Sequence, residues 1–443
     1  MAAKPAAPVN AAAFFPTGDA VPKAEAASLS QMARGMQGSK ILQIAADVAA
    51  QVAAGKAIAD FTVGDFARTE FRVPEILVKY TSEYLAAGET SYPPSEGVMA
   101  LRKAVQAQAL REMGLDYPLE SFIIAAGARP VLYGAYRCLI DPGEKVVYPA
   151  PSWNNKNFCQ LVGGVPVTVP TTPGSNFMPE VDALRAALKG ARLLVLCSPG
   201  NPTGTMIREA QMRAICEAIV EENRRREAAG ERVIFLIYDQ VYRNLVFGDV
   251  PHVTPVGVMP EMAAYTVFVD AISKCFAATG LRVGWMYGPP HVARQMKSLM
   301  THVGAWAPRA EQYAAARLID DEAEMKAFLT RHKGGIHARL HGLADGLSTL
   351  KAEGLPVDFI APEGAIYLSV KIDLEGRTGK LHLPDEDAVR AHLLEQAGCA
   401  VVPFSAFGDS LNRGWWRFSV GAVSEQQIHD AIPRLRAAIR QVV

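Results

Sequence analysis

Three short apolar segments decide the fold: RLLVLC at 192–197, VIFLIY at 233–238 and TVFVDA at 266–271. Each is β-branched or aliphatic and almost wholly apolar, which is typical of strands buried on both faces of a parallel sheet. A helical pattern at 209–226 separates the first two segments. This alternation predicts an α/β fold in which helices cover a mostly parallel sheet.

The pattern extends in both directions from this centre. Shorter strands are expected at 122–126, 145–148 and 165–169, and a helix at 98–113 with Ser95 as its N-cap. After about residue 331 a long helix, short strands at 358–360, 366–370, 400–402 and 416–420 and a closing helix at 424–443 predict a separate α+β domain. Residues 1–27 are rich in Ala and Pro without periodicity, so we expect a flexible tail or arm.

Composition narrows the function classes. The 443 residues carry 45 Lys and Arg against 45 Asp and Glu, and this zero net charge argues against nucleic acid or an anionic membrane as a main partner. The six cysteines form no CxxC pair, and no apolar run approaches the ~18 residues that span a bilayer. We therefore expect a soluble, cytoplasmic protein.

Polar residues follow several predicted strands, at the edge where open α/β sheets bind ligands. Ala128 and Arg129 begin a helix after the strand at 122–126, and free backbone N–H groups at such a turn suit a phosphate. Asn201 lies in the rigid loop SPGNPTG at 198–204. Taken alone, the first feature is also consistent with an ordinary strand–helix turn.

Three further charged residues lie at the end of an apolar strand, just after one, or inside one. Asp239 ends a strand, where burial of a carboxylate is costly unless it is paired. Its partner would be a cationic ring nitrogen, or the N–H groups of a helix that it caps. Tyr242 would face the same way if a helix begins there. Lys274 leaves the strand at 266–271 as a candidate amine nucleophile, with Arg282 eight residues later as a candidate phosphate clamp. Arg417 lies inside an apolar strand and needs an anion, such as a substrate carboxylate or an internal Asp or Glu.

Other catalytic motifs are absent from the sequence. It contains no GxGxxG, GxxxxGK[ST], GxSxG or HExxH. His337 and His341 are spaced i, i+4 without a carboxylate at the usual offset, so we expect no metal site.

Together these motifs resemble those of the class I aminotransferases, which are fold type I enzymes that use pyridoxal 5′-phosphate (PLP). The resemblance runs from about residue 29 to the C-terminus and is closest to the prokaryotic aspartate aminotransferase-like subgroup. Segment 273–284 looks like the family's PLP-lysine signature, with a departure only at Ala271. The resemblance implies a large domain at 76–325 with a mostly parallel seven-stranded sheet, and a small domain formed by 28–75 and 326–443.

The resemblance also implies roles for individual residues. Lys274 would form the internal aldimine and move the proton that leads to the pyridoxamine intermediate, with Asp239 on the pyridinium nitrogen as electron sink. The other residues implied to contact the cofactor are Tyr242 and Asn201 at the ring oxygen, Trp153 stacked on the ring, Ser273 beside the lysine, Ala128, Arg129 and Arg282 at the phosphate, and Tyr92 at the phosphate of a neighbouring subunit. Tyr92 thus implies a homodimer with shared active sites.

The substrate positions carry over in the same way. Arg417 matches the arginine that binds the α-carboxylate, Gly64 approaches that carboxylate through its backbone, and Trp153, Asn201 and Arg129 border the substrate. A cation at the position of Arg129 favours aspartate or glutamate as amino donor to a 2-oxo acid.

Departures near the substrate mouth leave alternatives open. Segment 64–68 lacks the family's Glu-Pro-Asp-Phe run, and Pro130 follows Arg129. The alternatives are an aminotransferase for aromatic, aliphatic or other neutral amino acids, and a PLP-dependent β-eliminating lyase on the same fold. A PLP-binding regulator would need a DNA-binding domain, for which a 27-residue tail is too short.

Overall fold

The structure is a computed structural model of the whole chain, and it describes residues 10–36, 38, 40–377 and 379–443. Two units, residues 1–38 and 39–443, are described separately. The first unit contains η1 (Ala11–Phe14), α1 (Ala20–Ser28) and α2 (Gln31–Gly35), and the Ser30 side chain caps α2 by accepting the Ala33 N–H. The stretch expected to be a flexible tail or arm, residues 1–27, therefore includes most of a helix at 20–28, where alanine-rich composition favours helix formation; residues 1–9 lie outside the described part.

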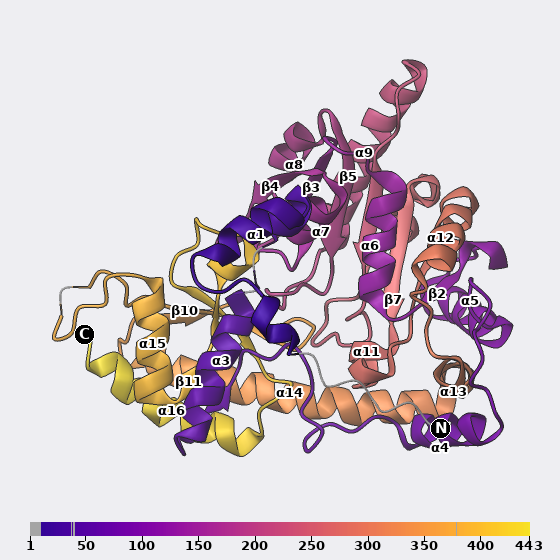
Figure 1. Cartoon of the computed structure of the whole chain (residues 1–443). Coiled ribbons are helices and arrows are strands. Elements are labelled where there is room, and N and C mark those ends of the chain that lie inside the picture. Colours follow the sequence, from indigo (N-terminus) through magenta and orange to yellow (C-terminus); the bar gives the residue numbers. More distant parts are fainter. Residues whose placement is uncertain (1–9, 37, 39, 378) are drawn as a thin grey trace, which may run out of the picture. The chain divides into compact units, whose positions relative to one another are not determined.

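A seven-stranded sheet forms the centre of the second unit (Figure 1). Its order is β2-β8-β7-β6-β5-β3-β4, with β8 antiparallel to both neighbours and the other pairs parallel. This confirms the predicted fold class. The strands are β2 (Ile123–Ala125), β3 (Lys145–Ala150), β4 (Val165–Pro170), β5 (Ala191–Cys197), β6 (Phe235–Asp239), β7 (Thr266–Ala271) and β8 (Gly284–Tyr287).

Successive residues of the central strands enter different cores, because side chains alternate across a sheet. In β5, Leu193 and Val195 pack into one apolar cluster, whereas Leu194 and Leu196 pack into another. Helices cover both faces, which is why these strands read as continuous apolar runs. The covering helices are α5 (Met99–Met113), α9 (Glu209–Ala228) and α13 (Arg309–Asp320) on one face, and α6 (Ala128–Leu139), α7 (Asn155–Val162) and α12 (Pro290–Val303) on the other.

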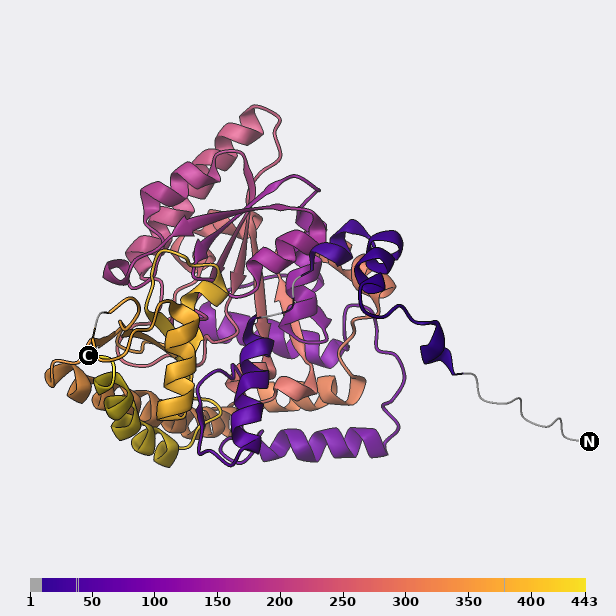
Figure 2. The same cartoon turned by 60° about the vertical axis from the view of Figure 1, so that its left-hand side comes forward.

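A third cluster of buried residues belongs to a smaller sheet with the order β12-β13-β10-β9. The long helix α14 (Glu322–Ala352) runs from α13 to this sheet and packs on α16, as Figures 1 and 2 show. Beside it, β1 pairs in parallel with β11. The elements are β1 (Ala59–Asp60), β9 (Val357–Phe359), β10 (Tyr367–Ile372), β11 (Cys399–Ala400), β12 (Val402–Pro403), β13 (Trp415–Ser419), α3 (Lys40–Ala53), α15 (Glu386–Ala397) and α16 (Glu425–Arg440).

The remaining helices are shorter or connect these layers. They are α4 (Glu75–Ala86), α8 (Val181–Leu188), α10 (Pro255–Val258), α11 (Ile272–Cys275), η2 (Leu119–Ser121), η3 (Pro173–Ser175), η4 (Pro260–Ala264), η5 (Thr279–Leu281) and η6 (Phe404–Phe407). None of the helices in the described ranges is both long and apolar enough to cross a membrane.

The start of α5 differs from its prediction. Its N-cap residue is Val98, not Ser95, and no side chain of the cap residue closes the helix end. Instead, the Val98 N–H donates to Oε1 of Gln312 on α13 at 2.8 Å. A tertiary partner thus replaces the local cap that the sequence pattern predicted.

Candidate active site

The parallel strands of the large sheet all end at one edge, and the polar residues singled out in the sequence follow those ends. Asp239 is the last residue of β6, Lys274 lies in α11 directly after β7, and Gly127 follows β2. Trp153 and Asn201 come after β3 and β5. The topology therefore gathers residues that lie far apart in the sequence at one place.

Lys274 places its amine against the loop that follows β1. Its Nζ donates to the carbonyl oxygen of Gly64 at 2.6 Å. Burial lowers the pKa of this amine to about 8; Asp65 acts in the opposite direction, and Arg417, Arg129 and Arg282 lower it further. An amine with a pKa this close to neutrality is a competent nucleophile and proton carrier.

Asp239 is a buried carboxylate beside this amine. Its Oδ1 accepts the backbone N–H of Val241 at 3.2 Å, so it caps a turn and not a helix. Burial raises its pKa to about 7, which the Val241 hydrogen bond and the Lys274 charge only partly offset. A cation placed next to this carboxylate would relieve its desolvation.

A cradle for an anion forms where β2 turns into α6. Gly127 has φ of +87°, and a Cβ on it would lie 2.4 Å from Nη2 of Arg282. Arg282 donates to the carbonyl oxygens of Ala126 at 2.8 Å and Thr279 at 2.6 Å, which holds it beside the first N–H groups of α6. A guanidinium and a helix N-terminus together favour a phosphate.

Arg417 reaches the same place from the small sheet. It is 2% exposed and donates to the carbonyl oxygen of Thr62 at 2.5 Å and to Oδ1 of Asn201 at 3.1 Å. Its guanidinium lies 4.8 Å from the ring centre of Tyr367 and 4.9 Å from that of Phe407. Its Nε has no hydrogen-bond partner among the described residues, which leaves a buried donor available to an anion.

Gly64 is small for a reason that the structure makes clear. A Cβ there would lie 3.0 Å from the Tyr367 hydroxyl and 3.6 Å from Nη1 of Arg417. A larger residue would therefore crowd the Tyr367 hydroxyl, whose ring lies against the Arg417 guanidinium.

Trp153 and Arg129 border the open side of the site. The Arg129 guanidinium lies 4.7 Å from the Trp153 ring centre, and its side chain is exposed. A cation–π contact of this kind holds the guanidinium in place and leaves its N–H groups free for an anionic ligand.

The prediction that Tyr242 faces the same way as Asp239 depended on a helix that begins there. Residues 241–244 form a turn instead of a helix. The Tyr242 hydroxyl pairs with that of Tyr367 at 2.6 Å. Sequence reasoning missed Tyr367, although a tyrosine inside the apolar strand β10 was a visible signal, and it missed Asp65, which follows Gly64 directly.

Two predicted residues lie apart from these contacts. Ser273 is buried behind Lys274, where its carbonyl oxygen accepts the Ala278 N–H at 3.0 Å. Tyr92 is 82% exposed, and its ring makes an edge contact with Trp306 at 5.2 Å.

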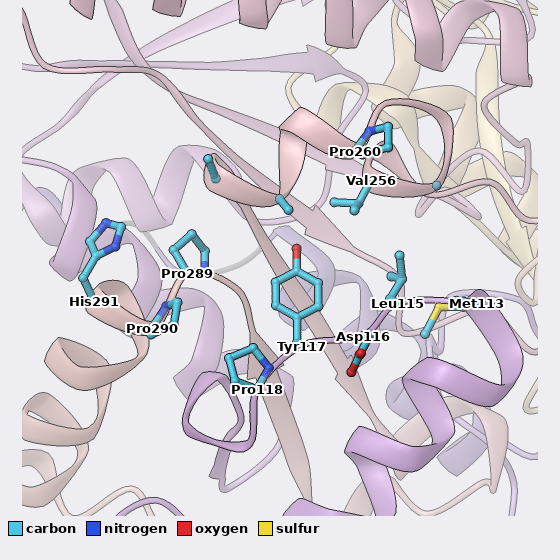
Figure 3. A pocket seen from close by; sticks show the side chains of 14 residues that line it. Met113, Leu115, Asp116, Tyr117, Pro118, Val256, Pro260, Pro289, Pro290 and His291 are labelled. Atoms are coloured by element: carbon cyan, nitrogen blue, oxygen red, sulfur yellow. The ribbon is translucent and has the colours of Figure 1, made fainter.

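A separate cavity of about 730 Å³ lies at the opposite edge of the sheet (Figure 3). Pro260 and Ala263 precede β7 there, and Pro289 and Pro290 follow the antiparallel β8. The Tyr117 ring stands in its middle. Its lining is mainly apolar, so the reactive groups of the chain gather at the other edge. Across the described residues, no group of three or more His, Cys, Asp or Glu side chains is placed to hold a metal ion.

The comparison with known families decides what this arrangement is. Residues 57–435 match the family described as aminotransferase class I and II. The chain belongs to this family. The aminotransferase is 31% identical over 373 residues to a probable aspartate/prephenate aminotransferase of Rhizobium leguminosarum bv. phaseoli, a match that covers 83% of this chain and 88% of the relative.

Solved structures agree with the family. The aspartate aminotransferase from Rhizobium meliloti superposes with a TM-score of 0.85 at 27% identity, over 94% of this aminotransferase and 99% of that chain. The aspartate aminotransferase from Thermus thermophilus with maleate gives a TM-score of 0.82 at 27% identity, over 93% and 99% of the two chains. The predicted family, fold class and transaminase activity are thus confirmed, whereas the roles of individual residues stay predictions.

Proposed function

We propose that this aminotransferase uses PLP and takes an acidic L-amino acid, aspartate or glutamate, as amino donor to a 2-oxo acid. One observation carries the proposal: a buried lysine amine and a buried carboxylate lie at the ends of adjacent parallel strands, and two guanidinium groups act on the charge of that amine. Lys274 and Asp239 form the first pair, and Arg417 and Arg129 are the guanidinium groups.

The residues fit this cofactor group by group. Asp239 is a buried carboxylate that a protonated ring nitrogen would pair with, and the Gly127–Ala128 turn with Arg282 would receive the phosphate. Trp153, which has the Arg129 guanidinium over one face of its ring, would stack on the cofactor ring with the other face. When bound, PLP supplies an electron sink that makes the Cα–H of an attached amino acid acidic.

The chain's own residues then have distinct tasks. The Lys274 amine would take the proton from the substrate Cα and return it to C4′ of the cofactor, because it is a buried basic group with a pKa of about 8, held at its Nζ by the Gly64 carbonyl oxygen. Arg417 orients the α-carboxylate through its unpartnered donor, with Asn201 fixing the plane of the guanidinium. Asp239 stays ionised once a cation faces it, which keeps that cation protonated.

Two arguments support an acidic substrate. A dicarboxylate has a second anion, and the Arg129 guanidinium is held over Trp153 with free donors at the open side. Maleate, a dicarboxylate, is the ligand named with the aspartate aminotransferase from Thermus thermophilus. The relative named for aspartate and prephenate makes prephenate one acceptor to test alongside 2-oxoglutarate.

The exposed Tyr92 supports a homodimer with shared sites. Its side chain is 82% exposed and contacts only the ring of Trp306 among the aromatic groups of the described residues, as expected for a residue that completes the site of a second subunit. Sedimentation of the loaded protein tests the assembly, and a Tyr92→Phe variant should bind PLP more weakly without losing the dimer.

Substitution of Arg129 by Leu tests the substrate class. We expect KM for L-aspartate to rise by about 10–100-fold, the loss of one charge-assisted interaction, with KM for L-alanine or L-phenylalanine almost unchanged. Lys274→Ala serves as the control that abolishes turnover of every donor. An unchanged KM for aspartate in Arg129→Leu would contradict the acidic-substrate proposal.

A further inference from the structure

The loop between β1 and α4 carries a carboxylate on the residue that follows the carbonyl group in contact with the reactive amine. Gly64, whose carbonyl oxygen accepts the Lys274 amine at 2.6 Å, is followed directly by Asp65. The Asp65 Oδ2 accepts the Thr279 hydroxyl at 3.1 Å, and its Oδ1 accepts the backbone N–H of Phe66 at 2.8 Å. Both oxygens are therefore fixed by donors.

Contacts to the backbone also fix the position of this loop. The Ala67 N–H donates to the carbonyl oxygen of Gly421 at 2.9 Å, and a Cβ on Gly421 would lie 2.2 Å from the Asp65 carbonyl oxygen. Since the Thr279 carbonyl oxygen accepts Arg282 at 2.6 Å, Asp65 connects the loop to the anion cradle. The small sheet and the lysine segment thus fix Asp65 from two sides.

The charges that face the Lys274 amine are mostly positive. The carboxylates come from the loop and from the end of β6, and the guanidinium groups come from α6, from the residue after η5 and from β13. They are Asp65 and Asp239, and Arg129, Arg282 and Arg417. Asp239 is the carboxylate assigned above to the cofactor ring, which leaves Asp65 as the carboxylate that offsets the three guanidinium groups at the amine.

We propose that Asp65 is a positioning residue whose carboxylate, anchored by Thr279, favours the protonated form of the free Lys274 amine and keeps it against the Gly64 carbonyl. This inference rests on the proposed function in that Lys274 is the reacting amine. An amine that must both accept and return a proton works best when its pKa stays near the working pH. Without Asp65, burial and three cations would push that pKa lower still.

The test measures the proton affinity of Lys274 without cofactor or turnover. Cofactor-free protein is exposed to cyanate over a pH series, and carbamylation of Lys274 is followed by peptide mass spectrometry, because only the neutral amine reacts. We expect Asp65→Asn to lower the pH midpoint by about one unit relative to the unsubstituted chain. Asp65→Glu, which keeps the charge, should stay within about 0.3 unit.

A matched control separates a local effect from a change in net charge. Asp116 is exposed at the opposite edge of the sheet, so Asp116→Asn makes the same charge change far from the amine and should leave the midpoint unshifted. Asp65→Ala gives the same readout if the Asn variant does not fold. An unshifted midpoint in the folded neutral variants, or an equal shift in Asp116→Asn, would overturn the inference.

The outcome is independent of the proposed function. If the loaded protein fails to transaminate, the carbamylation midpoint still reports on Asp65. If it does transaminate, the acid limb of kcat should move to lower pH in Asp65→Asn by the same amount, because Lys274 is a free amine only after the substrate has bound. A limb that stays in place overturns the Asp65 assignment alone.

Discussion

Replacing Gly284 by alanine tests how the anion cradle is built. Gly284 begins β8, where it pairs with Ala125 on one side and Ala271 on the other, next to the two strands that carry the cradle and the lysine. A Cβ on Gly284 would lie 2.6 Å from the carbonyl carbon of Gly127 and 2.7 Å from the Ala128 nitrogen. Ordinary contact begins at 3.4 Å, so the shortfalls are 3.4 − 2.6 = 0.8 Å and 3.4 − 2.7 = 0.7 Å.

The distance by which the Gly127–Ala128 turn must move sets the size of the effect on PLP binding and on stability. A backbone donor moved by this distance from a bond of about 2.9 Å leaves hydrogen-bonding range. The loss of one such bond to an anion costs about 1.5–3 kcal/mol, and overpacking costs about 1–3 kcal/mol of folding stability. We therefore expect Gly284→Ala to bind PLP about 10–100-fold more weakly and to unfold at lower denaturant concentration.

The assay is a PLP titration of cofactor-free protein, followed by visible absorbance, with chemical unfolding measured in parallel. Gly280→Ala is the matched control, because Gly280 lies four residues away with no atom within 4 Å of its added Cβ. It should bind PLP as the unsubstituted chain does. Unchanged affinity and stability in Gly284→Ala would refute the assignment of the Gly127–Ala128 turn to the phosphate.

Three further predictions follow from the buried charges. Asp239→Asn should stabilise the cofactor-free protein at pH 8 by up to about 4 kcal/mol and weaken PLP binding. The gain in stability should vanish near pH 4, because a pKa raised from 3.8 to about 7 makes the stability of the unsubstituted protein fall as pH rises between those values. Equal unfolding midpoints at pH 8 would contradict this. Arg243→Met should lower the free energy of unfolding by about 3–5 kcal/mol, since its side chain is 6% exposed and pairs with two carboxylates. Arg225→Met, at a 53% exposed ion pair, should leave the denaturant midpoint almost unchanged; equal denaturant midpoints for the two variants would contradict this. His332→Phe removes a 3.1 Å contact to the Lys274 carbonyl oxygen while keeping an aromatic ring, and should lower the free energy of unfolding by about 1–3 kcal/mol; a midpoint equal to that of the unsubstituted chain would show that this contact contributes nothing.

Most of the sheet could be predicted from the sequence because its strands are apolar on both faces. The segments at 192–197, 233–238 and 266–271 all became central strands with small boundary changes. The antiparallel β8 escaped prediction because it is only four residues long and begins directly after the lysine segment, at Gly284. Its glycine is required by a backbone contact from the turn between β2 and α6, which no local pattern reveals.

The candidate site was predictable where a residue type is unusual for its position. A lysine after a buried strand and an arginine within one, Lys274 and Arg417, stand out by their cost of burial alone. Tyr367 and Asp65 could not be found by their cost of burial, because their roles depend on partners from other elements. These partners are the Tyr242 hydroxyl and the Thr279 hydroxyl. The prediction of Ser95 as the cap of α5 was wrong for the same reason, since the Gln312 side chain, distant in sequence, accepts the Val98 N–H at the start of that helix.

The most direct test of the central claim is the visible absorbance of PLP-loaded protein before and after L-aspartate is added without an acceptor. The account predicts that the absorbance of the Lys274-bound cofactor disappears, that the amine form of the cofactor takes its place, and that one oxaloacetate is released per site. A band that stays unchanged with aspartate and glutamate, or release of ammonia in place of cofactor conversion, would contradict it.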